Sequence, residues 1–292
     1  MKRNSDLIFN IIMYGLAILL IIICFYPIYF VVIASFSSPS AVAGGEVILL
    51  PKGINLEGYK ELFQYDRIWL SYRNTIFYTL FGTLIVLAVN LPAAYALSRK
   101  ELPGKSWIMV LFIIPMFFSG GLIPTYLLIA DLNMLDTVWV MLIPTAVVTY
   151  YVIVARTFFQ QNLPNELWEA AQLDGCSYTY YFFKVVLPLS KAVIAVIGLW
   201  SAVGMWNSYF NALVYLRNPD LQPLQIVLRN ILINSQGMGS VTAGSATAEE
   251  ALRKTELLKY CTIVVASAPI LCLYPFLQKY FNQGVTVGSV KG

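Results

Sequence analysis

The sequence predicts an all-α integral membrane protein with six transmembrane helices and both termini on the cytoplasmic side. Of its 292 residues, 59% are hydrophobic and only 12% are charged, and the mean hydropathy is +0.70. Soluble domains carry about 25% charged residues, so this chain has roughly half the usual density of charge. A composition this apolar favours lipid as the solvent around most of the chain.

Composition also excludes several function classes. A net charge of +4 without a dense Lys/Arg run gives no support for nucleic-acid binding. The sequence has no histidine, which excludes a His-based catalytic triad, and its four cysteines show no spacing typical of a zinc site or a disulfide framework. We therefore predict no catalytic residue, no metal site and no cofactor bound by this chain.

Six apolar segments define the expected spans of a single transmembrane domain over residues 1–292. The first is about twice as long as a signal-peptide core of about 7–15 residues, so a retained helix is favoured over a cleaved leader. Gly and Pro interrupt the third, where freed backbone groups need a neighbouring helix or a water-filled cavity. The expected spans cover residues 7–34, 75–97, 107–130, 137–159, 189–216 and 260–281.

Two of the polar connections have features of their own. Within Ser35 to Arg73, apolar residues between Leu56 and Ile68 recur at roughly helical spacing, which predicts a short amphipathic helix on the membrane surface. The triplet Gly104-Lys105-Ser106 resembles the end of a phosphate-binding loop, but Arg99 occupies the position that needs glycine, so no such loop is expected. Residues 217–258 are expected to form a long polar loop.

The distribution of Lys and Arg orients the chain. With both termini inside, the cytoplasmic segments carry ten basic and five acidic residues, and the outer segments carry nine basic and ten acidic residues. Short loops carry most weight in this rule. Because the 99–105 turn is basic and the 131–136 turn has no Lys or Arg, residues 160–188 and the tail 282–292 are predicted to be cytoplasmic.

The longest polar interruption in the second half of the chain is Glu169 to Pro188. Pro164 suits a first helical turn, Asn165 is a good N-cap for the helix that follows, Gly175 can end that helix in a left-handed conformation, and Ser177 can cap a second helix. The residues alone leave two interpretations open. The stretch is either a docking element for a partner protein or an elbow that anchors the fifth span at the membrane interface.

Some residues in this stretch also form a more specific pattern. Glu169-Ala170-Ala171 is followed after three residues by Gly175 and, after nine more, by Val185 and Leu187-Pro188. This spacing resembles the EAA loop of bacterial ATP-binding-cassette (ABC) importer permeases, with Val185 where that family usually has Ile. The Asp174-Gly175 pair matches the fuller form found in sugar permeases.

The resemblance covers nearly the whole chain. It is closest to the maltose-type permeases for complex carbohydrates, and within these to the branch associated with polysaccharide-derived oligosaccharides. The supporting residues are Ser98-Arg99 after the second span, Trp206-Asn207 in the fifth, and the tail from Gln278 to Gly292.

This resemblance implies a type I importer fold in the bacterial cytoplasmic (inner) membrane. It implies pairing with a second, homologous permease, two copies of a cytoplasmic ATPase that bind ATP and Mg²⁺, and an extracytoplasmic solute-binding protein. Oligosaccharides, including uronate-containing ones, would be the substrate.

The resemblance also assigns roles to residues. Glu169 would pair with a basic residue in a cleft of the ATPase, while Ala170 and Ala171 let the helix seat in that cleft. The residues assigned to ATPase coupling are Glu169, Ala170, Ala171, Asp174, Gly175, Leu187 and Pro188. The tail residues assigned to ATPase contact are Gly288, Ser289 and Val290.

A substrate path is predicted from side-chain chemistry, since sugars need hydrogen-bonding groups and an aromatic face. The polar and aromatic residues at membrane depth are Asn90, Ser119, Thr145, Thr149, Tyr150, Tyr151, Ser201, Trp206, Asn207, Tyr209 and Asn211. Of these, we select Trp206, Asn207, Tyr209, Tyr150 and Asn90 as candidate contacts. Such residues also serve as polar contacts between helices, worth about 0.6 kcal/mol on average.

Two alternative functions remain open. One is the same permease architecture carrying a non-sugar solute, for which charged substrates usually require a basic residue in the path. The other, of a different class, is a stand-alone channel or ion-coupled carrier. A carrier would need intramembrane carboxylates, and spans two to six have none near mid-depth.

Overall fold

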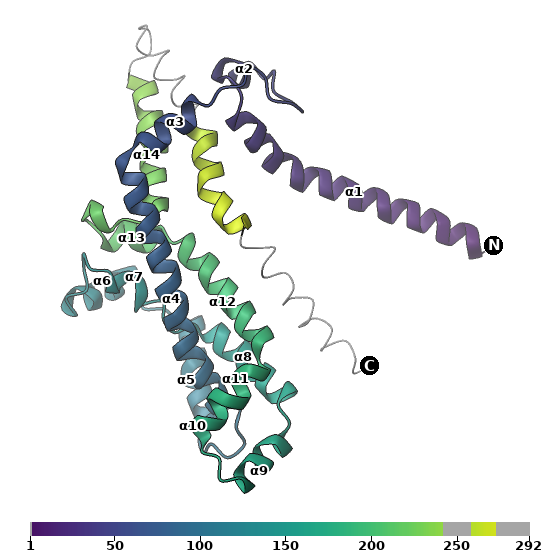
Figure 1. Cartoon of the computed structure of the whole chain (residues 1–292), viewed down its shortest axis with the longest axis vertical. Helices are drawn as coiled ribbons and strands as arrows, with labels where there is room; N and C mark the ends of the chain where they lie inside the picture. The colour runs from purple at the N-terminus through teal and green to yellow at the C-terminus, as the bar shows by residue number, and fades with distance from the viewer. Residues whose placement is uncertain (1, 242–257, 273–292) are drawn as a thin grey trace. The chain divides into compact units, whose positions relative to one another are not determined.

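The computed structural model describes residues 2–241 and 258–272, and all regular structure in that part of the chain is helical. Figure 1 shows the helices in chain order. By its internal contacts the chain divides into two compact units. The first comprises Met1–Trp69 and Val227–Ala268, and the second comprises Leu70–Ile226 and Pro269–Gly292. The division falls within three helices, which are α4, α14 and the helix over residues 258–272.

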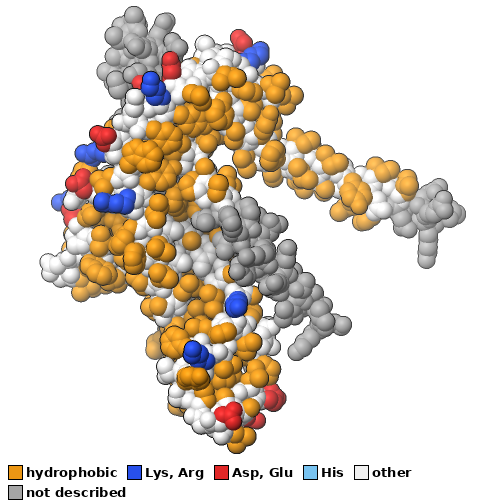
Figure 2. Space-filling model, in the orientation of Figure 1, with side chains coloured by type: hydrophobic (Ala, Val, Ile, Leu, Met, Phe, Trp, Pro, Cys, Tyr) orange, Lys and Arg blue, Asp and Glu red, His pale blue; other side chains and the backbone are white. Residues whose placement is uncertain are grey.

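Helix α1, Lys2–Ser35, is the longest helix of the first unit. At about 1.5 Å per residue its 34 residues reach about 50 Å, more than the roughly 30 Å of a bilayer core. The side chains from Leu7 to Ile28 are exposed, and Figure 2 shows hydrophobic side chains along its visible face. A helix that is apolar all round and uncovered is suited to lipid or to a membrane partner.

Three elements of the first unit gather at the carboxyl end of α1. They are α2, Pro39–Ala43, α3, Glu57–Gln64, and residues 258–268 of the helix over 258–272. The Ser35 and Tyr59 hydroxyls lie 2.7 Å apart, and the Cys261 thiol donates to the Ser35 carbonyl at 3.5 Å. Burial raises the pKa of Tyr59 above its ordinary value, while the bond to Ser35 opposes that shift.

The predicted amphipathic helix is present as α3, but it is shorter than expected. It ends at Gln64, and Ile68 belongs instead to α4, where it is fully buried. Of the expected sixth span, residues 260–272 are helical. Residues 273–281 lie outside the described part of the chain.

The second unit consists of α4 surrounded by shorter helices. One apolar cluster joins the carboxyl-terminal half of α4 to the segments that follow residue 149. Its buried residues include Tyr95, Phe159, Trp168 and Tyr181. The elements are α4, Asp66–Ser98; α5, Lys105–Phe117; α6, Leu122–Asp131; α7, Trp139–Leu142; α8, Thr149–Asn162; α9, Asn165–Leu173; α10, Tyr178–Tyr181; a π-helical segment, Phe182–Val186; α11, Leu187–Leu189; α12, Lys191–Trp206; α13, Phe210–Tyr215; a 3₁₀ turn, Pro219–Leu221; and the first residues of α14, Leu224–Val241, whose remainder belongs to the first unit.

Three of the expected spans are broken. The third consists of α5 and α6, which meet at 115° across a break at residues 118–121. A continuous helix over 137–159 is not present, because the chain leaves the helical conformation between α7 and α8. The expected fifth span bends by 82° where α11 meets α12, and it ends at Trp206 before α13 begins.

These breaks determine how many membrane crossings the helices support. Among the described residues, Leu7–Ser35 and Asp66–Ser98 are each long and apolar enough to cross a membrane. The two bent pairs raise the number to four if each pair counts as one span. These helices indicate a protein that crosses the membrane more than once. The six crossings expected from the sequence remain a prediction.

Asn90 supports the break between α7 and α8. It is completely buried on α4, and its Nδ2 donates to the carbonyls of Val86 and Ala146, each at 2.7 Å. Its Oδ1 accepts from the Val148 amide at 2.9 Å. Backbone groups that leave a helix inside an apolar environment need such partners, because water is not available there.

A helix also occupies part of the expected polar loop over 217–258. Helix α14 begins at Leu224, whose amide donates to the Thr75 hydroxyl of α4 at 2.7 Å. The side-chain amide of Asn74 donates to the backbone carbonyls of Asp220 and Gln222 at 2.7 and 3.1 Å. The start of α14 is therefore held by polar side chains of α4, a partner that local sequence pattern does not reveal.

We predict that Asn90→Leu destabilises the purified protein by about 2–4 kcal/mol, since it strands the Ala146 carbonyl and the Val148 amide. Thermal unfolding in detergent measures this. Asn162→Leu is the control, because among the described residues the Asn162 side-chain amide donates only to the Phe158 carbonyl within its own helix. Equal shifts for the two variants would contradict the role of Asn90.

Candidate functional site

The first candidate site is the α9–α10 loop, residues 164–188. The prediction that Asn165 caps α9 is wrong, because Pro164 occupies the N-cap position and Asn165 is the first helical residue. At the other end, the Cys176 amide donates to the Ala171 carbonyl at 2.9 Å and the Gly175 amide to that of Gln172 at 3.0 Å. With Gly175 at φ +72°, this is a Schellman motif, so the predicted left-handed glycine is confirmed.

The second helix of the loop begins as predicted. The Ser177 hydroxyl accepts from the Tyr180 amide at 3.3 Å and caps α10. A π-helical segment, Phe182–Val186, follows directly and leads through α11 into α12. Single π turns are rare in helices and are frequent at functional sites.

Aromatic stacking fixes the angle between α9 and α10. Trp168 on α9 is 3% exposed, and its ring stacks on Tyr178 with centroids 4.3 Å apart. Tyr181 meets the same indole edge-on at 5.0 Å. Each such pair contributes about 0.5–1.5 kcal/mol beyond burial, so the ring contacts stabilise the angle between the two helices across the Gly175 turn.

Exposure divides the predicted coupling residues into two groups. Glu169, Ala170, Asp174, Gly175 and Pro188 are exposed. Ala171 and Leu187 are half-buried and pack against the apolar cluster of their own chain. Ala171 therefore anchors α9 from behind, and Ala170 is the small residue that faces outward.

The outer side of α9 combines acidic and apolar side chains. Leu173 is 90% exposed beside Asp174, and acidic side chains are visible at the end of the second unit where α9 lies (Figure 2). A partner with an apolar pocket and basic residues at its rim would complement this face. We call this outer side of α9 the α9 surface, and its exposed residues are Glu166, Leu167, Glu169, Ala170, Leu173 and Asp174.

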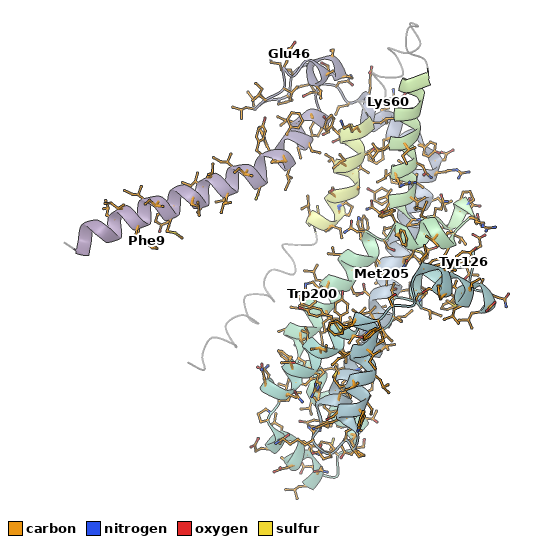
Figure 3. All side chains as sticks on the ribbon, turned by 180° about the vertical axis from the view of Figure 1, so that it is seen from behind. Phe9, Glu46, Lys60, Tyr126, Trp200 and Met205 are labelled. Carbon is orange, nitrogen blue, oxygen red and sulfur yellow. The ribbon has the colours of Figure 1, made fainter. Side chains whose placement is uncertain are left out.

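The second candidate site is a cavity of about 370 Å³. It lies where α4, the α7–α8 break and the carboxyl end of α12 meet; Trp200 and Met205, both on α12, are labelled in Figure 3. None of the residues that line it in the described structure is charged. Its polar and aromatic lining residues are Thr145, Tyr151, Ser201, Asn207, Ser208, Tyr209, Phe210 and Asn211.

One hydroxyl of this cavity stands out. Ser201 is 4% exposed, and its Oγ has no hydrogen-bond partner among the described residues. Most buried polar side-chain atoms are paired with protein or with water. Within the described residues, the Ser201 hydroxyl is therefore a buried, unpaired group in the wall of the cavity.

The structure separates the residues selected for the substrate path. Asn207 and Tyr209 line the cavity. Trp206 is buried and its ring packs against Tyr72 at 6.2 Å, and Asn90 is bonded to backbone, so neither lines it. Tyr150 is exposed beside Trp200, with ring centroids 5.6 Å apart, outside the cavity lining.

Thr145, Tyr151, Ser201 and Asn211, which were not selected, also line the cavity. Their polar side chains at membrane depth were the sequence feature that could have identified them as lining residues. Polarity alone does not show which side of a broken helix faces the cavity. The tail residues Gly288, Ser289 and Val290 lie outside the described part of the chain.

Comparison with protein families gives one match. Residues 68–287 match the family described as the binding-protein-dependent transport system inner membrane component. The matched region contains both candidate sites.

Individual relatives agree with that match. The chain is 39% identical to the polygalacturonan/rhamnogalacturonan transport system permease protein YtcP of Bacillus subtilis, covering 98% of this chain and 99% of the relative. It is also 39% identical to Protein LplC of Bacillus subtilis, covering 91% of this chain and 89% of the relative.

A solved structure is similar over nearly the full length. It is a chain in the crystal structure of a bacterial ABC transporter involved in the import of the acidic polysaccharide alginate. The TM-score is 0.85 at 34% identity, and the match covers 95% of this chain and 98% of that one. The two chains therefore share the same fold.

The Schellman turn leads to a test with a matched control. We predict that Gly175→Ala lowers stability by about 1–2 kcal/mol, because an L-residue with a Cβ is strained at positive φ. Gly104→Ala should cost a similar amount, since Gly104 has φ +70° and, like Gly175, open space where a Cβ would lie. Thermal unfolding of both variants measures this, and an unchanged Gly175→Ala would contradict the left-handed turn.

Proposed function

The chain belongs to the binding-protein-dependent transport system inner membrane component family, and from this premise we propose that it passes oligosaccharides through the membrane. As a member of that family it is the permease subunit of an ABC importer, and it is not itself a catalytic subunit. The family works with an ATPase and a solute-binding protein.

Two observations support an oligosaccharide as the substrate. The permease relatives include one named for polygalacturonan and rhamnogalacturonan, and the similar solved structure belongs to an alginate importer. The lining of the cavity combines hydroxyl, amide and aromatic groups without a charge, which suits a chain of hydroxyl-rich sugar rings. We propose polysaccharide-derived oligosaccharides, uronate-containing ones among them.

The α9 surface supports a proposal for coupling to ATP hydrolysis. Glu169 and Ala170 are exposed on a helix whose direction is fixed by the Gly175 turn and the Trp168–Tyr178 stack. That rigid, outward-facing arrangement is the observation that carries the proposal, because a docking element must transmit displacement without bending. Glu169 pairs with a basic residue of the ATPase, while Ala170 permits close approach.

The other coupling residues support this contact from either side. Asp174, Gly175 and Pro188 lie exposed along the loop, whereas Ala171 and Leu187 hold it on the apolar cluster. The tail residues Gly288, Ser289 and Val290 form a second contact with the ATPase. ATP and Mg²⁺ bind in the ATPase, and this chain holds no cofactor.

We further propose the composition and placement of the complete transporter. It contains this chain, a second homologous permease, two copies of the ATPase and an extracytoplasmic solute-binding protein. This chain crosses the bacterial inner membrane six times with both termini in the cytoplasm. The apolar, uncovered surface of α1 is consistent with contact to lipid or to another subunit in that membrane.

Two rival functions make different predictions. A permease for a small solute bound mainly through its charge would need charged groups in its path, and the described cavity lining has none. A uronate-containing oligosaccharide also offers many hydroxyl groups to the polar lining. A stand-alone channel or ion-coupled carrier functions as a single gene product. The proposed permease should instead co-purify with a second permease and an ATPase.

We predict that Glu169→Arg abolishes sugar uptake and lowers the amount of ATPase that co-purifies, because it opposes the basic residue of the docking cleft. The protein should still insert into the membrane, since Glu169 is exposed. Uptake assays and subunit stoichiometry after purification measure these effects. Asp131→Arg is the control, because it reverses an exposed carboxylate at the end of α6. Normal uptake with Glu169→Arg would overturn the docking assignment.

The cavity yields a separate prediction. Ser201→Ala should lower maximal uptake by about twofold to tenfold, since it removes a hydrogen bond of about 0.5–1.5 kcal/mol to the solute in transit. The affinity of the solute-binding protein should not change.

Ser190→Ala is the matched control for this variant. Ser190 is also buried, and its hydroxyl has no hydrogen-bond partner in the described part of the chain, but it does not line the cavity. An equal loss of uptake in the two variants would show that the Ser201 effect is structural.

A further inference from the structure

An arginine at the end of α4 lies between two aromatic rings that belong to different elements. Arg99 directly follows the last residue of α4, Ser98. Its guanidinium carbon is 5.2 Å from the centroid of Trp168 on α9 and 5.7 Å from that of Tyr95 on α4. The side chain is 11% exposed, so these cation–π contacts are largely shielded from water.

The neighbouring charges distinguish Arg99 from other cations at this helix end. Glu101 pairs with its Nε at 3.4 Å, and Lys105 donates to the Arg99 carbonyl at 3.2 Å. Arg156 of α8 donates to the Leu97 carbonyl at 3.2 Å. Of these residues, Arg99 is the one with a described contact to α9.

The surroundings leave room for movement at this point. A cavity of about 480 Å³ is lined by Arg99, Tyr95 and Tyr178, among others. The hydroxyls of Tyr95 and Tyr181 are buried without a hydrogen-bond partner among the described residues. A junction with free volume and unused polar groups can rearrange at lower cost than a close-packed one.

Helix α4 continues from this junction to the solute cavity. Val86 of α4 lines that cavity, and Asn90 of α4 holds the Ala146 carbonyl and the Val148 amide at the α7–α8 break. Val148 and its neighbour Thr145 line the cavity as well. A continuous set of contacts therefore runs from α9 through Arg99 and α4 to the cavity wall.

We propose that Arg99 is a positioning residue that transmits movement of α9 to α4, and through α4 to the cavity wall. This proposal rests on the proposed docking of the ATPase at the α9 surface. The planar guanidinium can stay between the two rings while they shift, because its attraction to an aromatic face does not depend on one bond direction. Arg99 acts through Trp168 and contacts neither the ATPase nor the solute.

The test is the number of sugar molecules transported per ATP hydrolysed by the reconstituted transporter. Arg99→Gln should retain the ATPase and continue ATP hydrolysis, while this ratio falls by about threefold to tenfold. Arg99→Lys should restore part of the ratio, because lysine keeps the charge but not the planar stack.

Two control variants test whether the effect is specific to Arg99. Arg156→Gln removes an arginine that binds the same helix end without a described contact to α9, so the ratio should not change. Glu101→Gln removes the half-exposed ion pair of Arg99, which should also have little effect. A fall in the ratio with Arg156→Gln equal to that with Arg99→Gln would overturn the proposal.

A double-mutant cycle tests whether Arg99 acts through Trp168. Trp168→Leu should lower the ratio, and adding Arg99→Gln should cause no further loss. Independent, additive losses would overturn the proposal. If Arg99→Gln fails to assemble, Arg99→Lys decides, since a ratio equal to that of the natural protein would exclude a role specific to the guanidinium.

Failure of this proposal can be told apart from failure of the docking assignment. Loss of uptake with Glu169→Arg, together with an unchanged ratio with Arg99→Gln, would overturn only the role of Arg99. Normal uptake with Glu169→Arg would overturn the docking assignment itself.

Discussion

Backbone groups that leave a helix in an apolar environment need a polar partner, and in this protein α4 supplies it at several points. The Asn74 side chain donates to the carbonyl of Asp220, just before α14, and the Thr75 hydroxyl accepts from the first amide of α14. Asn90 pairs with both sides of the α7–α8 break. These contacts allow short, broken helices to pack around one long helix instead of forming independent rods.

The same helix connects the two candidate sites. Its carboxyl end meets α9 through Arg99 and Trp168, and its middle contributes Val86 to the cavity. The α9–α10 loop is rigid because of a left-handed glycine and a stacked pair of rings, whereas the junction beside it contains free volume. Rigid elements joined at a loosely packed point are what a transporter needs to convert docking into a change of cavity shape.

Local sequence signals predicted the local features well. The Gly175 turn, the Ser177 cap and the existence of α3 follow from residue types at short spacing, and the structure confirms them. Gly and Pro indicated an interruption of the third span, and the structure has its break at 118–121. Periodicity could not predict the break at 143–148, because Asn90, distant in sequence, stabilises it. For the same reason Asn90 was assigned to the solute path, although its polar atoms are bonded to backbone. The direction in which Ala171 faces also depends on tertiary packing.

The most direct measurement of the coupling role is photo-crosslinking from position 170 in the assembled transporter. Ala170 is exposed on the α9 surface, and replacing it with benzoylphenylalanine should produce a crosslink to the ATPase subunit on illumination. The same residue at Leu132, exposed after α6, should produce none. A crosslink from position 132 and not from position 170 would contradict docking at the α9 surface.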